Sequence, residues 1–220
     1  MTQRGLRRWL GGQLPGASER RAQTEAFAAE WSQDNRVAAA AEGPLWVALG
    51  DSTAQGIGAS ERSHGYVLEV LSRLRAQRNP EWQVVNLSRT GARVADVLGD
   101  QLTAMAQIRP AALVTCAIGA NDLLPGRGRN LVASVQQLAE ALPPGALLAT
   151  LPQGLSKARA EEVNQTIRAV AAARGLIVVD LWARTGPPWK DKYAGDMFHP
   201  NDRGYDDWVS AFCDALDLDG

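Results

Sequence analysis

A serine early in the chain and an aspartate–histidine pair near its end could together carry out nucleophilic chemistry. Ser52 follows the apolar run 44–49 and the pair Gly50-Asp51. An apolar strand that ends on glycine places the next side chains at the carboxyl edge of a sheet, where open α/β folds bind their ligands. Ser52 is therefore a candidate nucleophile, and that role requires a base within hydrogen-bond reach and an acid that orients the base.

His199 is the candidate base, and Asp196 is the candidate acid. Asp196 precedes His199 by three residues in a long loop after the last predicted strand. A carboxylate at this spacing can bond the imidazole ring and stabilise its protonated form. The second histidine, His64, is interpreted as a solvent-exposed loop residue, and the alternative is a position at the border of the pocket.

Three groups are candidates for binding the negative oxygen that forms when a serine attacks a carbonyl group. They are the side-chain amide of Asn121 and the backbone N–H groups of Ser52 and Gly91. Glycine at position 91 permits a close approach between the backbone and a substrate. The neighbouring carboxylates of Asp51 and Asp122 are interpreted as structural braces that hold a turn or loop by accepting backbone N–H groups.

The chain that must position these residues alternates between strand and helix patterns. Apolar runs predict strands at 45–49, 83–87, 112–118, 146–151 and 176–181, and helical spacing of apolar residues predicts helices at 18–35, 66–78, 94–108, 131–142, 157–173 and 202–216. Ser18 and Asn201 are predicted to cap the first and last of these helices. Short connections between alternating elements predict a three-layer α/β/α sandwich around a five-stranded parallel sheet.

Residues 182–200 interrupt the alternation with a long stretch rich in proline and glycine. A loop of this length inside a compact domain usually has a function or lacks order. Trp189 is predicted to line a pocket, whereas Trp182 is explained equally well by packing in the core.

The polar segments at the strand ends resemble the sequence blocks of the SGNH hydrolases, also called the GDSL esterases and lipases. Residues 50–52 (Gly-Asp-Ser) are similar to the first block, 86–91 to the second, 119–122 (Gly-Ala-Asn-Asp) to the third, and 196–199 (Asp-Met-Phe-His) to the fifth. Each segment alone is a weak signal, and their order, each at a predicted strand end, carries the specificity. Thr53 replaces the leucine that usually follows the serine, and Ser88 stands where the second block often has glycine.

The resemblance covers residues 50–199 and implies a flavodoxin-like SGNH hydrolase fold. It implies that Ser52 is the nucleophile, with Asp196 and His199 completing a catalytic triad. It also implies that Gly91 and Asn121, together with the Ser52 N–H group, form the oxyanion hole.

The function expected from this reading is hydrolysis of carboxylic esters, small or short-acyl, through an acyl-enzyme on Ser52. The alternatives are an acyl-CoA thioesterase or a lysophospholipase of the same family, and a catalytically inactive binding module on the same fold. A flavodoxin-like nucleotide binder also fits the strand pattern, but it needs a phosphate loop after the first strand. Asp51 is an unfavourable charge at such a loop.

Composition limits the partners that we expect. The 220 residues carry a formal net charge of -1, which gives no general attraction to nucleic acid or to anionic lipid. No apolar run is long enough to cross a membrane, so stable insertion is not expected. We expect a small-molecule ester as the partner, a monomer or small homo-oligomer, and a cytoplasmic location.

Neither a cofactor nor a metal is expected, because the sequence has two histidines and no metal-ligand spacing. Cys116 and Cys213 lie in apolar stretches and are interpreted as buried free thiols. Residues 1–43 are expected to form an N-terminal tail, at 1–16, and a helix that packs on the main domain. Residues 44–220 are expected to form the hydrolase domain.

Overall fold

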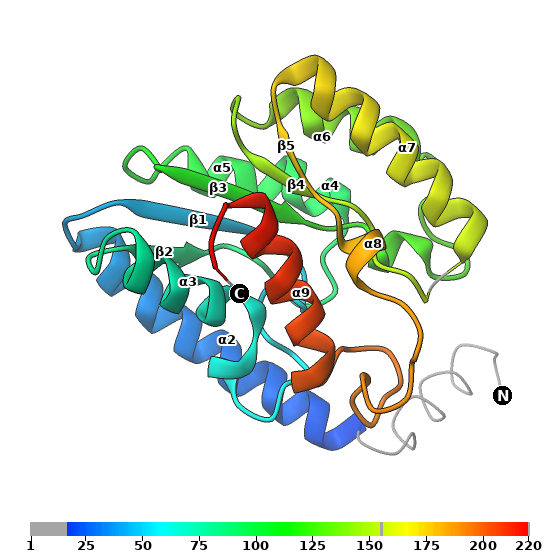
Figure 1. Cartoon of the computed structure of the whole chain (residues 1–220), viewed down its shortest axis with the longest axis horizontal. Helices are drawn as coiled ribbons and strands as arrows, with labels where there is room; N and C mark the ends of the chain where they lie inside the picture. Colours follow the sequence, from blue (N-terminus) through cyan, green and yellow to red (C-terminus); the bar gives the residue numbers. More distant parts are fainter. Residues whose placement is uncertain (1–16, 155, 220) are drawn as a thin grey trace, which may run out of the picture.

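The centre of the fold is a five-stranded parallel sheet, seen in a computed structural model that describes residues 17–154 and 156–219 (Figure 1). Its strands are β1 (Leu45–Gly50), β2 (Gln83–Asn86), β3 (Leu113–Ala117), β4 (Leu147–Ala149) and β5 (Ile177–Val179). The predicted α/β sandwich is confirmed. Strands β2 to β5 are shorter than predicted, because apolar residues beyond their ends, such as Ile118 and Leu151, are buried without joining the sheet.

Strand β1 lies at the point in the sheet where the strand order reverses. The strand order is β2-β1-β3-β4-β5, so β1 pairs with β2 on one side and with β3 on the other. In such sheets the crevice at the carboxyl ends of these central strands is where ligands bind. Ser52 follows β1 and Asn121 follows β3, so the topology places both residues at this crevice.

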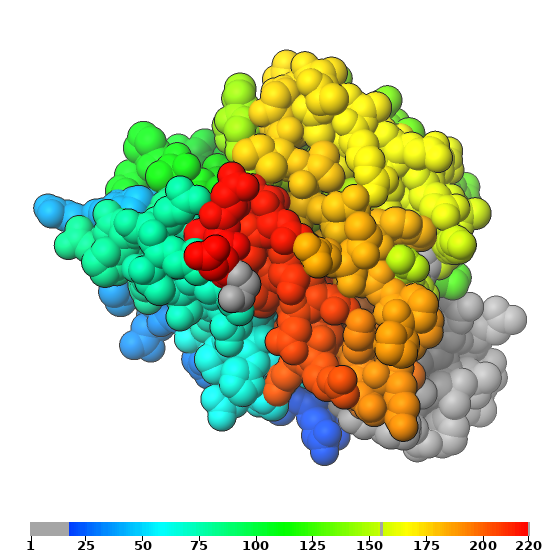
Figure 2. Space-filling model, viewed as in Figure 1, coloured from blue at the N-terminus to red at the C-terminus, as the bar shows by residue number. Residues whose placement is uncertain are grey.

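Helices cover both faces of the sheet (Figure 1). One face packs against α4 (Val94–Asp96), α5 (Leu102–Met105), α6 (Leu131–Ala141) and α7 (Lys157–Arg174), and the other against α3 (Tyr66–Gln77) and α9 (Asp202–Ala215). Alternate residues of β1 divide between the two cores: Val47 packs on the α4–α7 side, and Trp46 on the α3–α9 side. Figure 2 shows α9 at the centre of one face, between α3 and the orange segment that precedes α9.

Four of the six predicted helices agree closely with the structure, and the helix predicted at 94–108 does not. Helices α3, α6, α7 and α9 end within one residue of their predicted ends, and Asn201 caps α9 by accepting the Gly204 N–H group at 3.1 Å. The predicted helix 94–108 is wrong as a single helix, because a π-helical turn, Val97–Gln101, separates α4 from α5. A short helix, α8 (Leu181–Arg184), also begins the stretch predicted to be irregular.

The first described helix, α2 (Ala17–Ala40), is longer than the predicted helix 18–35, and Ser18 lies inside it rather than at its cap. It crosses the edge of the sheet that β2 forms, since Trp31 packs into the core on the α3–α9 side and Ala38 into the core on the α4–α7 side. The Asn35 side chain donates to the Asn86 carbonyl at 2.8 Å and accepts the Asn86 N–H group at 2.7 Å. Helix α2 therefore satisfies backbone groups that the edge strand β2 would otherwise expose.

Other sequence expectations concern the thiols, the tail and the membrane. Cys116 and Cys213 are buried free thiols, as predicted, and burial raises the pKa of both. The predicted tail, residues 1–16, lies outside the described residues. No helix in the described ranges combines the length and the apolar character needed to span a membrane.

Replacing Phe212 with alanine should strongly destabilise the fold. Phe212 is fully buried in α9 and stacks on Tyr66 of α3, with ring centroids 4.6 Å apart. The cavity left behind should lower the free energy of unfolding by about 3–5 kcal/mol in urea titrations. The matched control is Val37→Ala at a position that is 64% exposed, which should change that free energy by about 0.5 kcal/mol or less. A similarly small effect of Phe212→Ala would contradict the packing of α9 on α3.

Candidate active site

Ser52, His199 and Asp196 form a continuous line of contacts. His199 Nε2 lies 2.9 Å from Ser52 Oγ, and His199 Nδ1 lies 2.6 Å from Asp196 Oδ2. The other carboxylate oxygen of Asp196 accepts the backbone N–H groups of Phe198 and His199, each at 3.0 Å. Ser52 and His199 are buried. The structure thus brings together the three residues that the sequence nominated as nucleophile, base and acid.

Ser52 is positioned by a glycine that ends β1. A Cβ atom at Gly50 would lie 2.6 Å from the carbonyl oxygen of Ala117 in β3, so a side chain cannot be accommodated there. The buried Gln101 side chain binds both backbone groups of Gly50, accepting its N–H group at 2.9 Å and donating to its carbonyl at 2.8 Å. The backbone that leads into Ser52 is therefore held on two sides.

A second glycine lets the serine loop touch the histidine loop. Gly58 has a φ of 103°, and a Cβ atom there would collide with the Pro200 carbonyl oxygen and lie 2.7 Å from His199 Cβ. Nearby, Ser60 donates its N–H group to Asp202 at 2.7 Å and its hydroxyl to the same carboxylate at 2.6 Å. Close packing and these hydrogen bonds hold His199 against the loop that carries Ser52.

The two carboxylates closest to the serine and the histidine have different environments. Burial alone would raise the pKa of Asp196, but hydrogen bonds from the His199 ring and from two backbone N–H groups outweigh it and leave this pKa below its usual value. Burial raises the pKa of Asp51, although Thr53 donates its N–H group at 3.0 Å and its hydroxyl at 2.8 Å. Asp51 thus braces its own loop, as predicted.

Asn121 and Gly91 lie at the same sheet edge and close to each other. The Asn121 amide donates to the carbonyl of Ala92, the residue after Gly91, at 3.0 Å, and to Asp51 Oδ2 at 3.3 Å. Gly91 is exposed, with a φ of 77°. Asp122 accepts the Val94 N–H group at 3.1 Å, so it braces the segment after β2 from the loop after β3. The segments after β1, β2 and β3 therefore converge beside Ser52.

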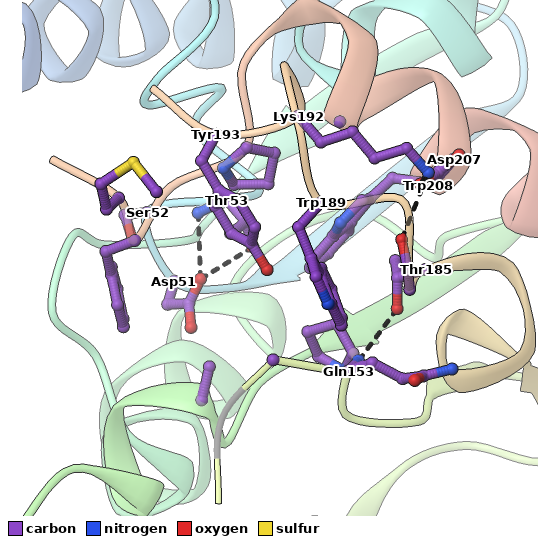
Figure 3. Close-up of a pocket in the computed structure, with 18 residues that line it drawn as sticks. Asp51, Ser52, Thr53, Gln153, Thr185, Trp189, Lys192, Tyr193, Asp207 and Trp208 are labelled. Atoms are coloured by element: carbon purple, nitrogen blue, oxygen red, sulfur yellow. Dashed lines mark hydrogen bonds and ion pairs between the residues drawn. The ribbon is translucent and has the colours of Figure 1, made fainter. Parts of the chain in front are cut away.

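A cavity of about 410 Å³ opens beside Ser52 (Figure 3). Its lining is largely apolar and includes Pro152, Trp189, Tyr193, Met197, Phe198 and Trp208. Trp189 lines the cavity, as predicted, whereas Trp182 packs against the core. The polar groups in the wall pair with one another: Lys192 Nζ lies 2.7 Å from Asp207, and the Thr185 hydroxyl accepts the Gln153 N–H group at 2.9 Å.

His64 is an exposed loop residue, as predicted, and its side chain binds Ser60 and Asp202 rather than the cavity. The described residues contain no group of three or more His, Cys, Asp and Glu side chains placed to hold a metal ion.

Three polar residues that contact the site were missed by the sequence reasoning. Gln101 binds Gly50, as described above. Gln55 donates to the Ser88 carbonyl at 3.1 Å and accepts the Thr90 hydroxyl at 2.6 Å, which shapes the loop before Gly91. Arg20 Nε lies 2.7 Å from Asp196 Oδ2. No sequence motif marks these residues, because their partners lie on other elements. Gln55 could have been suspected from its position alone, because it is a polar residue three positions after the candidate nucleophile Ser52.

Comparisons with known proteins identify the family and the fold. Residues 48–206 match the GDSL-like Lipase/Acylhydrolase family. The solved acetylxylan esterase Axe2 from Geobacillus stearothermophilus is 22% identical, with a TM-score of 0.64 over 81% of this chain and 96% of Axe2. LAE5, an α/β hydrolase enzyme from the metagenome of Lake Arreo in Spain, is 23% identical, with a TM-score of 0.63 over 81% of this chain and 97% of its own.

A third solved structure, TesA, is 25% identical, with a TM-score of 0.63 over 78% of this chain and 97% of TesA. A comparison with curated protein sequences found no match. This chain covers almost the whole length of each of these three solved structures, so the similarity extends over the whole three-layer fold.

Asp196→Asn should weaken the dependence of stability on acid pH. Because the pKa of Asp196 is lowered in the folded state, its carboxylate stabilises the fold above the unfolded pKa of about 3.9. This stabilisation is lost as the pH falls through the lower folded value. We therefore expect the difference in the free energy of unfolding between wild type and Asp196→Asn to be largest near pH 6. It should shrink as the pH approaches about 3.

Urea titrations across this pH range measure the difference directly. Glu140→Gln, at an exposed position of α6, is the control that removes one carboxylate on another element. A difference that stays constant from pH 6 to pH 3 would show that the Asp196 carboxylate is not stabilised by its contacts.

Proposed function

The chain belongs to the GDSL-like lipase/acylhydrolase family, and we propose that it is a serine esterase that hydrolyses carboxylic esters through an acyl-enzyme on Ser52. The observation that carries this proposal is the position of His199 Nε2, 2.9 Å from Ser52 Oγ and on the ring that Asp196 binds at 2.6 Å. A serine hydroxyl becomes a nucleophile when an oriented base accepts its proton.

In the proposed mechanism His199 takes the hydroxyl proton of Ser52 as Oγ attacks the ester carbonyl carbon. Asp196 stabilises the imidazolium ion that results. Collapse of the tetrahedral intermediate breaks the bond to the alcohol oxygen, and His199 returns the proton to the departing alcohol. Water then attacks the acyl-enzyme with His199 again as the base, which releases the acid and restores Ser52.

The negative oxygen of the intermediate would be held by the N–H groups of Ser52 and Gly91 and by the amide of Asn121. Support for this role comes from the contact between Asn121 and the residue after Gly91, at 3.0 Å. The second hydrogen bond of this amide, to Asp51, is long at 3.3 Å, so a substrate oxyanion could replace it at little cost.

The cavity supports an uncharged, short acyl group longer than acetyl as the substrate. Its lining is mostly aromatic and aliphatic, and burial of methylene groups there would favour binding. The cation in this wall, Lys192, is already neutralised by Asp207. A catalytically inactive binding module is the less supported reading, because nucleophile, base and acid are all present and in contact.

Ser52→Ala should abolish ester hydrolysis without unfolding the protein. Loss of the nucleophile should lower kcat for p-nitrophenyl butyrate by about a thousandfold or more. A fluorophosphonate probe should label the wild type, and mass spectrometry should locate the adduct on Ser52. The control is Ser63→Ala, an exposed serine in the loop that follows Ser52, which should keep both activity and labelling. Labelling or turnover that persists in Ser52→Ala would overturn the proposal.

The acyl preference can be measured with p-nitrophenyl esters that differ only in acyl length. Each methylene buried in the cavity should contribute about 0.8 kcal/mol, which is about fourfold in kcat/KM, until the cavity is full. Trp189→Ala should lower kcat/KM for hexanoate more than for acetate, because only the longer chain would contact this wall. A preference for acetate, or an equal loss on both esters, would contradict the assignment of the cavity to the acyl group.

A further inference from the structure

Helix α2 lies outside the part of the chain that matches the family. The family match begins at residue 48, whereas α2 spans Ala17–Ala40. The acetylxylan esterase Axe2 is covered over 96% of its length by only 81% of this chain. Helix α2 nevertheless reaches the candidate active site, where one of its side chains contacts Asp196.

The contact is made by Arg20, the fourth residue of the described helix. Its Nε atom lies 2.7 Å from Asp196 Oδ2, the same oxygen that lies 2.6 Å from His199 Nδ1. The Nε–H group is not aligned for a hydrogen bond, so the contact is an ion pair. Both side chains are largely shielded from water, with exposed fractions of 18% for Arg20 and 21% for Asp196. One carboxylate oxygen is therefore shared by a guanidinium and the imidazole.

The rest of α2 holds Arg20 in this position. Gln23 donates to the Ala59 carbonyl at 2.7 Å and accepts the Gly58 N–H group at 3.0 Å, and both partners belong to the loop that touches His199. Further along the helix, Trp31 donates to the Gln55 carbonyl at 3.1 Å. These bonds attach α2 to the serine loop. The backbone at Arg20 is therefore already ordered, and placing its side chain beside Asp196 costs less conformational entropy.

The charged and titratable groups around the Asp196–His199 pair lie on α2, on the loop after β1, on α9 and on the turn that ends at His64. Arg20 approaches from α2, and the carboxylate of Asp51 acts from the loop after β1. The Tyr205 phenol approaches from α9, and burial raises its pKa well above 10, so it stays uncharged. Asp202 and His64 lie at the surface, where they bind each other and Ser60.

We propose that Arg20 is a positioning residue that holds the Asp196 carboxylate against His199 and opposes protonation of the imidazole. A cation beside Asp196 offsets the negative charge that the imidazole experiences, and therefore disfavours the imidazolium form. The base then stays free of its proton to a lower pH. The proposal rests on the proposed function, because it requires His199 to act as the base.

The experiment compares Arg20→Met, Arg20→Lys and Arg21→Met. Arg21 is the matched control, since it is the next residue of α2 and is 83% exposed. Within 17–154 and 156–219, its one ion pair is with Glu25 across one turn. For each variant kcat/KM is measured against pH with p-nitrophenyl butyrate in a pH-stat. Thermal unfolding is recorded at every pH, so that a loss of fold is separated from a loss of the base.

In Arg20→Met the acid limb of the profile should move to higher pH by about 0.5–1 unit, because removal of the cation makes the imidazolium easier to form. The plateau should also fall about three- to tenfold, since Asp196 loses one of its restraints. Arg20→Lys keeps the charge and should keep the wild-type acid limb. Arg21→Met should match the wild type in both limb and plateau.

An acid limb that does not move in Arg20→Met, with a plateau that falls equally at every pH, would overturn the proposal and leave Arg20 a structural role. Should Arg20→Met fail to fold, Arg20→Gln removes the charge with a smaller change in shape and is read in the same way. Failure of the proposed function is a separate result: it would appear as turnover in Ser52→Ala, whatever the Arg20 variants do.

Discussion

The candidate active site depends on direct packing between two loops that are far apart in the sequence. The loop after β1 carries Ser52, and the loop before α9 carries His199, 147 residues later. Gly58 sits where they meet, with no room for a Cβ atom against Pro200 and His199. The short distance from imidazole to hydroxyl follows from this contact, since a side chain at position 58 would push the loops apart.

Buried polar side chains convert that contact into a fixed geometry. Gln101 holds both backbone groups of Gly50, and Gln55 holds the loop before Gly91. Asn86 donates to the Ala54 carbonyl at 2.7 Å, which joins the end of β2 to the serine loop. These three side chains have their partners inside the protein, so movement of one loop would leave donors or acceptors unpaired. The loops at the carboxyl edge therefore behave as one unit.

The features that could be predicted from the sequence are those whose pattern lies within one short segment. Strand β1 could be predicted because residues 45–49 form an uninterrupted apolar run that ends at Gly50. Ser52, Asn121 and His199 could be nominated because each stands in a short motif at a strand end. The π-helical turn that brings Gln101 to Gly50 could not, because apolar spacing over 94–108 fits an uninterrupted helix equally well. Arg20 could not either, since a charged residue on a helix is normally solvated and its partner belongs to the last loop.

The position of Arg20 also shows how two requirements on the acid of such a site can oppose each other. A carboxylate stabilises the imidazolium best when its charge is unshared, but it orients the ring best when it cannot move. The Arg20 guanidinium shares the charge of Asp196 and restricts its motion at once. Asp196 retains three hydrogen bonds from residues 198 and 199, so its orientation does not depend on Arg20 alone. The electrostatic effect on the imidazole is therefore the larger part of what α2 adds to the site.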